Sequence, residues 1–490
     1  MASKHIHLSG ICGTAMASLA GLLTEKGFSV TGSDAAAYPP MSDQLRAMGI
    51  PVAQPYAESN LEPRPDLVVI GNALSRGNPE VERVLDERIP FTSMAAILHE
   101  EFLVGRESLV VAGTHGKTST TSMLAWIYQT ASRSNPALEP SFLIGGVAEN
   151  FSTSYQLRPT RSFLLEGDEY DTAFFDKGPK FLHYFPDGLI LTSVEFDHAD
   201  IYADLEAVKL AFKRLVNLVP RRGVIVAYDG SENVTECVSR ALCRVERYGF
   251  APDSDWRIEN LRHQLGKSLW DVYRDGKLWA ALEMAVAGEH NALNATAAAA
   301  LAANQGIPVE AIQEALASFE SVKRRLEVRD VIDGVTIIDD FAHHPTAIRE
   351  TLRALRQVYG DARLWAILEP RSNTLRRNVF EHELVGSLAL ADRVILDAVY
   401  QQQRIPEGQR LHPEQVIAAL NSQGTPATLC ANVNEIISLL DAELRPGDVV
   451  AILSNGGFDG IYEKLPARLR QKSVDREKQE REQERQMAKA

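Results

Sequence analysis

The segment from residue 109 to residue 121, LVVAGTHGKTSTT, limits the possible folds of this chain more than any other. A short apolar run ends at Ala112, a turn follows, and Gly116-Lys117-Thr118 opens a stretch that is predicted to be helical through Ala131. This order of strand, loop and helix is typical of a phosphate-binding loop, whose backbone N–H groups and helix N-terminus face the phosphates. In such a loop the lysine reaches the terminal phosphates and the threonine can bind Mg²⁺.

The loop departs from the strict spacing of this motif. A glycine is expected five residues before Gly116, and the chain has Val111 there, so that Gly113 is the only other glycine of the loop. The alternative is a glycine-containing turn in which Thr and Ser cap an ordinary helix. The Gly-Lys-Thr run at the predicted helix start favours phosphate binding over that alternative.

Composition and charge exclude several classes of protein. A formal net charge of −14 argues against a general binder of nucleic acid or of anionic membranes. No run approaches the roughly 18 apolar residues of a membrane span, and the first residues lack a signal-peptide core. The 4 cysteines have no metal-ligand spacing. We therefore expect a cytoplasmic protein with reduced thiols, and its 490 residues suggest roughly three domains.

The first hundred residues are predicted to form an α/β unit. A short strand, His5–Ser9, leads through Gly10-Ile-Cys-Gly13 into a helix, and a second strand ends at Gly32-Ser33-Asp34. This arrangement suits a nucleotide, with phosphate on the helix N-terminus and the carboxylate on a ribose. The glycine pattern is incomplete, so a nicotinamide cofactor is not implied, and an ordinary strand–helix turn fits equally well. The polar loop Asn72–Glu80 either faces a ligand or is solvated, with Pro79 starting a helix.

Acidic residues follow two strands of the predicted central α/β unit. Glu166 comes after the strand Ser162–Leu165, and Asp197-His198 follows the strand Gly188–Leu191. Ligands bind at the carboxyl edge of such sheets, and carboxylates with an imidazole near a phosphate loop can hold the Mg²⁺ that offsets phosphate charge. Either cluster alone would be a solvated acidic turn. The two together, after a phosphate loop, favour a metal site.

Two further regions carry polar residues at the starts of helices or the ends of strands. His290, Asn291 and Asn294 can share one face near the start of an Ala-rich helix, where amides suit a base or ribose edge, although helix capping by Asn291 fits equally well. After the junction Lys323-Arg324-Arg325, a third α/β unit is predicted, with polar loops after its strands. The tail from about Gln471 to Ala490 is highly charged and is either a frayed helix or a disordered extension.

Together these motifs resemble the Mur ligase family, the ATP-dependent amide-forming enzymes of bacterial cell-wall precursor synthesis. The markers, in order, are Gly113–Thr118, the Glu166 cluster, Asp197-His198, His290-Asn291-x-x-Asn294 and Asp340-Phe-Ala-His-His-Pro345. The resemblance covers the chain to about residue 465. It implies an α/β protein with a Rossmann-like UDP-sugar-binding domain at residues 1–106, a P-loop ATP-binding domain at 107–322, a Rossmann-like closing domain at 323–470 and a charged tail at 471–490.

The resemblance also implies which residues of this chain bind each ligand. UDP-sugar binding would involve Gly10, Gly13, Ser33, Asp34 and Asn72. ATP binding would involve Gly113, Thr114, His115, Gly116, Lys117, Thr118, Ser119, His290, Asn291, Asn294, Arg324, Arg325 and Asp340. Mg²⁺ would be held by Thr118, Glu166 and His198. The peptide substrate would be met by His343, His344, Arg371, Ser372 and Asn373. The catalytic residues would be Lys117, Glu166, His198 and His344.

Two members of the family share most of these motifs and act on UDP-N-acetylmuramate, but differ in the amine that they add. One adds L-alanine, in primary peptidoglycan synthesis. The other adds the recovered murein tripeptide L-alanyl-γ-D-glutamyl-meso-diaminopimelate, in murein recycling. The stretches Glu166–Lys177, Ser193–Tyr202 and Glu369–Thr374 resemble the tripeptide-adding member, whereas the glycine turn, Gly32–Asp34 and the His-His-Pro-Thr run are similar to the alanine-adding one. We expect the tripeptide as acceptor and keep L-alanine as the alternative.

The reaction catalysed by the family explains why these residues occur together. ATP phosphorylates the lactoyl carboxylate, and the peptide amine then attacks the acyl phosphate. Lys117, Mg²⁺ and loop N–H groups would stabilise the developing charge, and His198 or His344 could assist the amine in losing its proton. A closing third domain would exclude water. Phe212 stands where several family members carry a carbamylated lysine, so none is expected here.

Alternatives from other classes remain open. An inactive nucleotide-sugar-binding regulator on the same fold is one, although intact Lys117, Glu166 and His198 argue against it. A dehydrogenase would leave the phosphate loop unexplained. The resemblance implies a monomer or weak homo-oligomer that binds neither nucleic acid nor membrane and contributes to cell-wall biogenesis, cell shape, cell division and the cell cycle.

Overall fold

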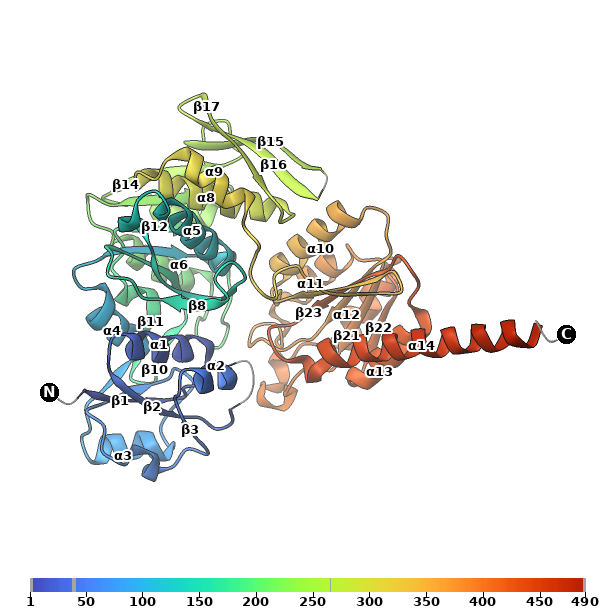
Figure 1. Cartoon of the computed structure of the whole chain (residues 1–490), viewed down its shortest axis with the longest axis horizontal. Helices are drawn as coiled ribbons and strands as arrows, with labels where there is room; N and C mark the ends of the chain where they lie inside the picture. Colours follow the sequence, from blue (N-terminus) through green and yellow to red (C-terminus); the bar gives the residue numbers. More distant parts are fainter. Residues whose placement is uncertain (1–2, 38–40, 265, 488–490) are drawn as a thin grey trace. The chain divides into compact units, whose positions relative to one another are not determined.

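The computed structural model describes residues 3–37, 41–264 and 266–487, and Figure 1 shows the ribbon. The chain divides into two compact units. The first holds the residues up to 323 apart from 287–289, and the second holds 287–289 and the residues from 324 onward. A five-stranded and a ten-stranded sheet lie in the first unit, and a six-stranded sheet lies in the second. Helices connect and cover these sheets, so the predicted α/β class with three α/β parts is confirmed.

The N-terminal sheet is entirely parallel, in the order β3-β2-β1-β4-β5. Its central strand is buried, with Ile6 and Leu8 fully covered. The strands are β1 (His5–Ser9), β2 (Ser29–Ser33), β3 (Val52–Ala53), β4 (Leu67–Ile70) and β5 (Phe91–Ser93), and the helices are α1 (Thr14–Glu25), α2 (Met41–Ala47), α3 (Pro79–Asp86) and α4 (Met94–Leu98). Pro79 does start a helix, because the Asn78 side chain accepts hydrogen bonds from the N–H groups of its first turn.

The central sheet has a parallel core in the order β14-β13-β12-β6-β9-β7, and β8 pairs antiparallel with β7. The strands are β6 (Glu107–Ala112), β7 (Ser141–Ala148), β8 (Thr153–Gln156), β9 (Ser162–Gly167), β12 (Gly188–Leu191), β13 (Val224–Tyr228) and β14 (Arg244–Gly249). The helices are α5 (Lys117–Ser132), α6 (Leu205–Val216), α7 (Glu232–Val238), α8 (Glu289–Asn304) and α9 (Val309–Ala317). A separate hairpin, β10 (Asp171–Ala173) and β11 (Asp176–Pro179), follows β9. The largely parallel sheet was predicted correctly.

An antiparallel extension of the central sheet was not predicted. β15 (Trp256–Gln264) continues the sheet in parallel with β14, and β16 (Lys267–Arg274) and β17 (Lys277–Met284) follow as antiparallel strands. Figure 1 shows these strands beside α8 and α9, with which Trp270 and Leu282 share a core. The extension therefore covers the alanine-rich helix that begins near the phosphate loop.

The second unit is built on one sheet in the order β18-β19-β23-β20-β21-β22, parallel apart from β18. Its strands are β18 (Glu327–Ile332), β19 (Val335–Asp340), β20 (Leu364–Leu368), β21 (Arg393–Asp397), β22 (Ala427–Cys430) and β23 (Val449–Leu453). Its helices are α10 (Pro345–Tyr359), α11 (Glu381–Leu388), α12 (Pro413–Ser422), α13 (Val433–Glu443) and α14 (Ile461–Met487). The charged tail is thus helical up to Met487. Among the described residues no helix is both long and apolar enough to cross a membrane.

Candidate active site

The predicted phosphate loop lies between β6 and α5. Gly113 and Gly116 have φ angles of +139° and +79°, in a region that residues with a Cβ rarely adopt. A Cβ on Gly113 would lie 2.1 Å from Thr192 Oγ1, and one on Gly116 would lie 2.6 Å from Asn294 Oδ1. Gly116 is also the N-cap residue of α5 and has no side chain, so the alternative of a Thr or Ser cap is wrong. The helix start keeps the uncapped N–H groups that an anion site uses.

Lys117, at the start of α5, is folded into the loop. Its ammonium donates to the carbonyl of Gly113 at 2.7 Å and to Glu169 Oε2 at 2.8 Å. Burial alone would lower the pKa of Lys117, but the carboxylates of Glu169, Asp168 and Glu166 outweigh it and raise this pKa. The lysine is therefore charged and adjacent to the loop, as an interaction with phosphate requires.

Glu166 and Thr118 provide two neighbouring oxygen atoms. The Thr118 hydroxyl donates to Glu166 Oε1 at 2.9 Å, and the Gly145 N–H donates to Glu166 Oε2 at 2.8 Å. Loss of hydration, together with the negative charge of Asp168, raises the pKa of Glu166. A carboxylate whose charge is disfavoured in this way is stabilised by a cation, and hydroxyl and carboxylate oxygens suit Mg²⁺. The donor set therefore fits the predicted ion.

His198 lies next to the same cluster. Its Nε2 is 3.1 Å from Glu169 Oε1, and its φ of +54° is unusual for a residue with a side chain. Burial lowers the pKa of His198, and the hydrogen bond and negative charge of Glu169 more than compensate, so the net shift is upward. Glu169 thus joins His198 to Lys117. The sequence reasoning noted the acids of this loop but did not select Glu169, which is 2% exposed.

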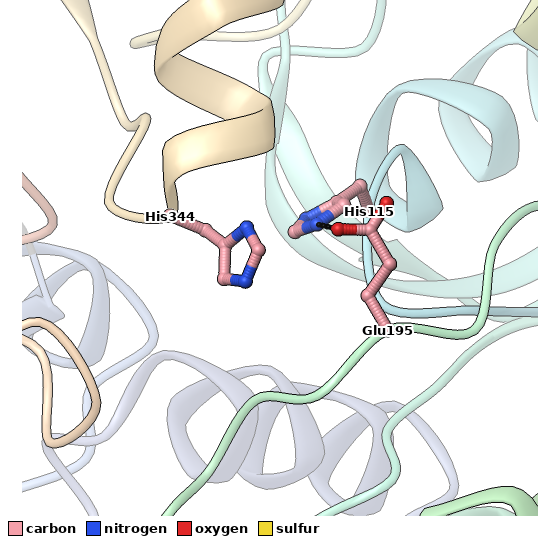
Figure 2. A group of neighbouring side chains, drawn as sticks. All are labelled: His115, Glu195 and His344. Atoms are coloured by element: carbon pink, nitrogen blue, oxygen red, sulfur yellow. Dashed lines mark hydrogen bonds and ion pairs between the residues drawn. The ribbon is translucent and has the colours of Figure 1, made fainter. Parts of the chain in front are cut away.

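His115 and Glu195 form a second contact beside the loop. Figure 2 shows the hydrogen bond between them, with His115 Nε2 3.4 Å from Glu195 Oε2. The Glu195 N–H also donates to the Thr114 hydroxyl at 2.8 Å, so the β12–α6 connection braces the loop. His344, also drawn in Figure 2, belongs to the other unit, where its Nδ1 accepts from the Thr346 N–H at 3.3 Å and caps α10.

The predicted asparagines lie on α8. Asn291 and Asn294 are 5% and 7% exposed. Asn294 lies against Gly116, as the Cβ distance shows, so the structure brings this residue to the phosphate loop. α8 begins at Glu289, two residues before Asn291, which therefore is not its N-cap. The capping alternative is wrong for Asn291. His290 lies on the same first turn, and Ser119 lies in the first turn of α5.

In the N-terminal domain, the glycine turn and Asp34 meet at one place. Gly10 has a φ of +86°, Gly13 precedes α1, and Asp34 Oδ2 accepts from the Cys12 N–H at 2.9 Å. Asn72 is exposed. A direct contact between Ser33 and the ligand was expected. In the structure the Ser33 side chain is fully buried, and its hydroxyl donates to Glu80 Oε2 at 2.6 Å. Ser33 supports the loop from behind.

Glu80 was missed by the sequence reasoning, although it ends the polar loop that was singled out. It is fully buried, and it accepts from Ser9 at 2.5 Å and from Asn60 at 2.8 Å as well as from Ser33. Burial would raise the pKa of Glu80, but hydrogen bonds from His7, Ser33, Ser9 and Asn60 lower it to about 2. This carboxylate ties the ends of β1 and β2 to α3.

In the second unit, Asp340 and Arg324 are engaged within their own domain. Asp340 is 4% exposed and accepts from the N–H groups of Leu326 and Ala342 at 2.8 Å and 2.9 Å. These two hydrogen bonds fix the Asp340 carboxylate at the end of β19. Arg324 lies 3.2 Å from Asp339 and donates to Tyr462, whereas the Arg325 guanidinium lies 5.2 Å from the centre of the Phe341 ring.

The residues predicted to meet the peptide form a local group after β19 and β20. The Ser372 hydroxyl donates to the carbonyl of His343 at 3.4 Å, and Asn373 accepts from Arg376. Arg371 pairs with Glu369 at 3.2 Å, and its guanidinium lies 3.9 Å from the centre of the Tyr400 ring. The structure thus places His343, Arg371, Ser372 and Asn373 at one edge of the second unit's sheet.

This fold, with a phosphate loop and an adjoining carboxylate–imidazole cluster, defines a nucleotide-binding α/β ligase, and the chain belongs to the Mur ligase family. Family models match it at residues 5–103 (Mur ligase family, catalytic domain), 111–302 (Mur ligase middle domain) and 324–456 (Mur ligase, glutamate ligase domain). These matches span all three sheets.

Individual relatives are also similar over nearly the whole chain. The UDP-N-acetylmuramate--L-alanyl-gamma-D-glutamyl-meso-2,6-diaminoheptandioate ligase of Escherichia coli strain K12 is 43% identical, over 94% of this chain and 97% of its own length. The crystal structure of a murein peptide ligase from Psychrobacter arcticus has a TM-score of 0.73 and 36% identity, covering 95% of this chain and 99% of that one. A UDP-N-acetylmuramate--L-alanine ligase of Lachnoclostridium phytofermentans is more distant, at 30% identity over 94% of this chain and 97% of its own length.

Proposed function

We propose that this chain is an ATP-dependent, ADP-forming amide ligase acting on UDP-N-acetylmuramate. It joins the lactoyl carboxylate of this sugar nucleotide to the amine of L-alanyl-γ-D-glutamyl-meso-diaminopimelate through an acyl phosphate, in murein recycling. The observation that carries the choice of acceptor is the difference in identity, 43% to a tripeptide-adding ligase against 30% to an L-alanine-adding one. Both relatives match over nearly their full lengths, so the comparison covers all three domains.

The residues of the phosphate loop supply the electrostatics that this reaction needs. Formation of the acyl phosphate and attack by the amine both concentrate negative charge on oxygen atoms. The Lys117 ammonium and the N–H groups at the α5 N-terminus are the donors that stabilise this charge. Asn294, which lies against Gly116, and the neighbouring Asn291 are assigned to the adenosine side of ATP.

Thr118, Glu166 and His198 would hold Mg²⁺, either directly or through its waters. The support for this assignment is the contact between the Thr118 and Glu166 oxygens and the raised pKa of Glu166, which a cation would bring back down. Mg²⁺, when bound, offsets the charge of the phosphates and of the transferred phosphoryl group. His198 or His344 is the candidate to accept the proton that the attacking amine loses.

The domain roles follow the family. Residues 1–106 would bind the UDP-sugar through Gly10, Gly13, Asp34 and Asn72. Ser33 would hold this site in place through its hydrogen bond to Glu80. Residues 107–322 would bind ATP, and residues 323–470 would present Arg371, Ser372 and Asn373 to the peptide, with Arg324, Arg325 and Asp340 toward the nucleotide. Because ATP and a nucleotide sugar are its proposed substrates, we expect the enzyme to act in the cytoplasm. We propose that it is a monomer or weak homo-oligomer. Through cell-wall biogenesis it would contribute to cell shape, cell division and the cell cycle.

The test is phosphate release from ATP in the presence of Mg²⁺ and UDP-N-acetylmuramate, with the tripeptide or L-alanine as the amine. We expect turnover with the tripeptide and little with L-alanine, and no phosphate release when either the sugar nucleotide or the amine is omitted. The converse preference would move the chain to the L-alanine-adding reaction. Absence of turnover with both amines, in a folded protein that still binds UDP-N-acetylmuramate, would favour an inactive nucleotide-sugar-binding regulator.

A further inference from the structure

A second buried lysine lies beside the candidate metal site and has no part in the chemistry proposed above. Lys180 is 4% exposed and begins the 3₁₀ helix η4 (Lys180–His183), directly after the β10–β11 hairpin. Its ammonium lies 3.3 Å from Asp168 Oδ2 and 4.1 Å from the centre of the Tyr170 ring. A buried ammonium is unfavourable unless it is paired, so Asp168 and Tyr170 stabilise Lys180 in its buried position. In turn, the Lys180 ammonium orients the Asp168 carboxylate and the Tyr170 ring.

Tyr170 connects this lysine to His198. The two ring centres are 5.3 Å apart, with an angle of 51° between the ring planes. Burial, together with the charge of Asp168 and a hydrogen bond to it, raises the pKa of Tyr170 well above its ordinary value, so the hydroxyl stays neutral. His198 has a φ of +54°, a conformation that persists only where the surroundings impose it. The Tyr170 ring is one of the surfaces that do so.

The backbone of this region is fixed independently of the lysine side chain. The N–H groups of Lys180 and Phe181 donate to the carbonyls of Tyr170 and Asp168, each at 3.2 Å. Replacement of the Lys180 side chain leaves these two hydrogen bonds possible. The acidic loop is therefore expected to keep its course in a variant, while the Asp168 carboxylate and the Tyr170 ring lose the cation that orients them.

We propose that Lys180 is a positioning residue that holds the Tyr170 ring against His198. It thereby fixes the orientation of the His198 imidazole toward the candidate metal site. The inference rests on the proposed function, in which His198 helps to hold Mg²⁺. Electrostatics alone predict the opposite effect of removing this lysine, because loss of a nearby positive charge strengthens the binding of a divalent cation. The sign of the change in metal affinity therefore distinguishes positioning from charge.

The experiment measures Mn²⁺ binding, as free Mn²⁺ by electron paramagnetic resonance, in full-length protein with a non-hydrolysable ATP analogue. We expect Lys180→Met to weaken Mn²⁺ binding about tenfold, as loss of a residue that orients a metal ligand does. Lys180→Arg should restore most of the affinity, because it keeps the charge above the ring. Lys177→Met, which removes a lysine paired with Asp171 at 2.5 Å on the same hairpin, is the matched control and should bind Mn²⁺ like the wild type.

Turnover gives a second readout. The Mg²⁺ concentration for half-maximal activity should rise in Lys180→Met, while the KM for the tripeptide stays unchanged. If Lys180→Met does not fold, Tyr170→Leu removes the ring instead and should weaken Mn²⁺ binding to a similar extent. Unchanged or tighter Mn²⁺ binding in a folded Lys180→Met or Tyr170→Leu protein would overturn the inference. His198→Ala tests the metal site itself: wild-type Mn²⁺ affinity in that variant would contradict the site rather than the role of Lys180.

Discussion

At the scale of single residues, the charges of the candidate site are arranged in pairs. Lys117 compensates Glu169 at 2.8 Å and Lys180 compensates Asp168 at 3.3 Å. Glu166, in contrast, is bonded to a hydroxyl and a backbone N–H. Of Glu166, Asp168 and Glu169, Glu166 is thus the one without a lysine partner, since its hydrogen bonds come from neutral donors. This is the reason to assign it to the metal.

The ion pair between Lys117 and Glu169 affects both activity and stability. Lys117→Ala should abolish turnover, because the phosphates lose their principal cation. It should also lower the free energy of unfolding by about 3 kcal/mol, because the buried Glu169 carboxylate loses its lysine partner and keeps only the hydrogen bond to His198. Phosphate release and urea denaturation measure the two effects. Adding Glu169→Gln should recover much of the stability and none of the turnover, and a double variant that regains activity would contradict the role of Lys117.

Glu80 should make the N-terminal domain sensitive to acid. Its pKa is lowered from 4.5 to about 2, so its contribution to stability is complete above pH 4.5 and is lost as the pH falls toward 2. Glu80→Gln should therefore be less stable than the wild type at pH 7 by about 1–3 kcal/mol, and the difference should narrow at pH 3. Urea unfolding at both pH values measures it, with Glu58→Gln, at an exposed position, as control. A difference that is equal at both pH values would argue against the charged network.

At the scale of elements, the hairpin β10–β11 joins the first two domains. Its turn carries Phe174, which packs against the apolar cluster that includes Leu61 and Val68, and Phe175, whose ring meets that of Phe91 edge-on at 4.9 Å. The same hairpin leads into Lys180. One short element of the central domain therefore contacts the N-terminal core and continues to the candidate metal site.

The long C-terminal helix α14 has two parts with different roles. Ile461 and Leu465 are fully buried and Leu469 is 6% exposed, whereas Arg476 reaches Asp333 at 2.9 Å in an exposed ion pair. A chain that ends at residue 475 loses this ion pair and should retain wild-type stability within about 0.5 kcal/mol, because exposed ion pairs contribute little. Thermal unfolding measures this.

A chain that ends at residue 460 loses the three buried side chains, each contributing about 2–4 kcal/mol, and its second unit should not fold. Cooperative unfolding of this shorter chain with wild-type stability would show that α14 is dispensable for the core.

At the scale of the whole molecule, the second unit has its own core on both faces of its sheet. Along β20, Trp365 and Ile367 belong to one apolar cluster, and Ala366 and Leu368 belong to the other. Alternate residues of a strand point to opposite faces, so helices cover both sides. This is the arrangement of an independent domain.

A fragment comprising residues 324–490 should therefore fold by itself. We expect a single cooperative thermal transition and an α/β circular dichroism spectrum, without binding of UDP-N-acetylmuramate, whose proposed site lies in the first unit. The complementary fragment, residues 1–323, should bind the sugar nucleotide and release no phosphate. Lack of cooperative unfolding in the C-terminal fragment would show that its core depends on the first unit.

The sequence by itself predicted the local elements well. The strand before the loop, the helix through Ala131 and the strand Leu364–Leu368 were found because each is encoded by a continuous apolar run beside a glycine or a polar turn. The strands β15 to β17 were missed, although Trp270 and Val272 alternate with more exposed residues as in a half-buried strand. This alternation is the sequence signal from which these strands can be found.

The candidate phosphate loop, the acids after β9 and β12, the three α/β domains and the family could be predicted from the sequence, because glycines, helix starts and strand ends are local features. Only the tertiary structure decided which polar side chains hold other residues of the site in place and which line the site itself. Ser33 meets Glu80 across 47 residues, and Lys117 meets Glu169 across 52. Such pairs depend on how strands lie next to one another in a sheet. The order of strands in a sheet cannot be predicted from hydrophobic periodicity along the chain.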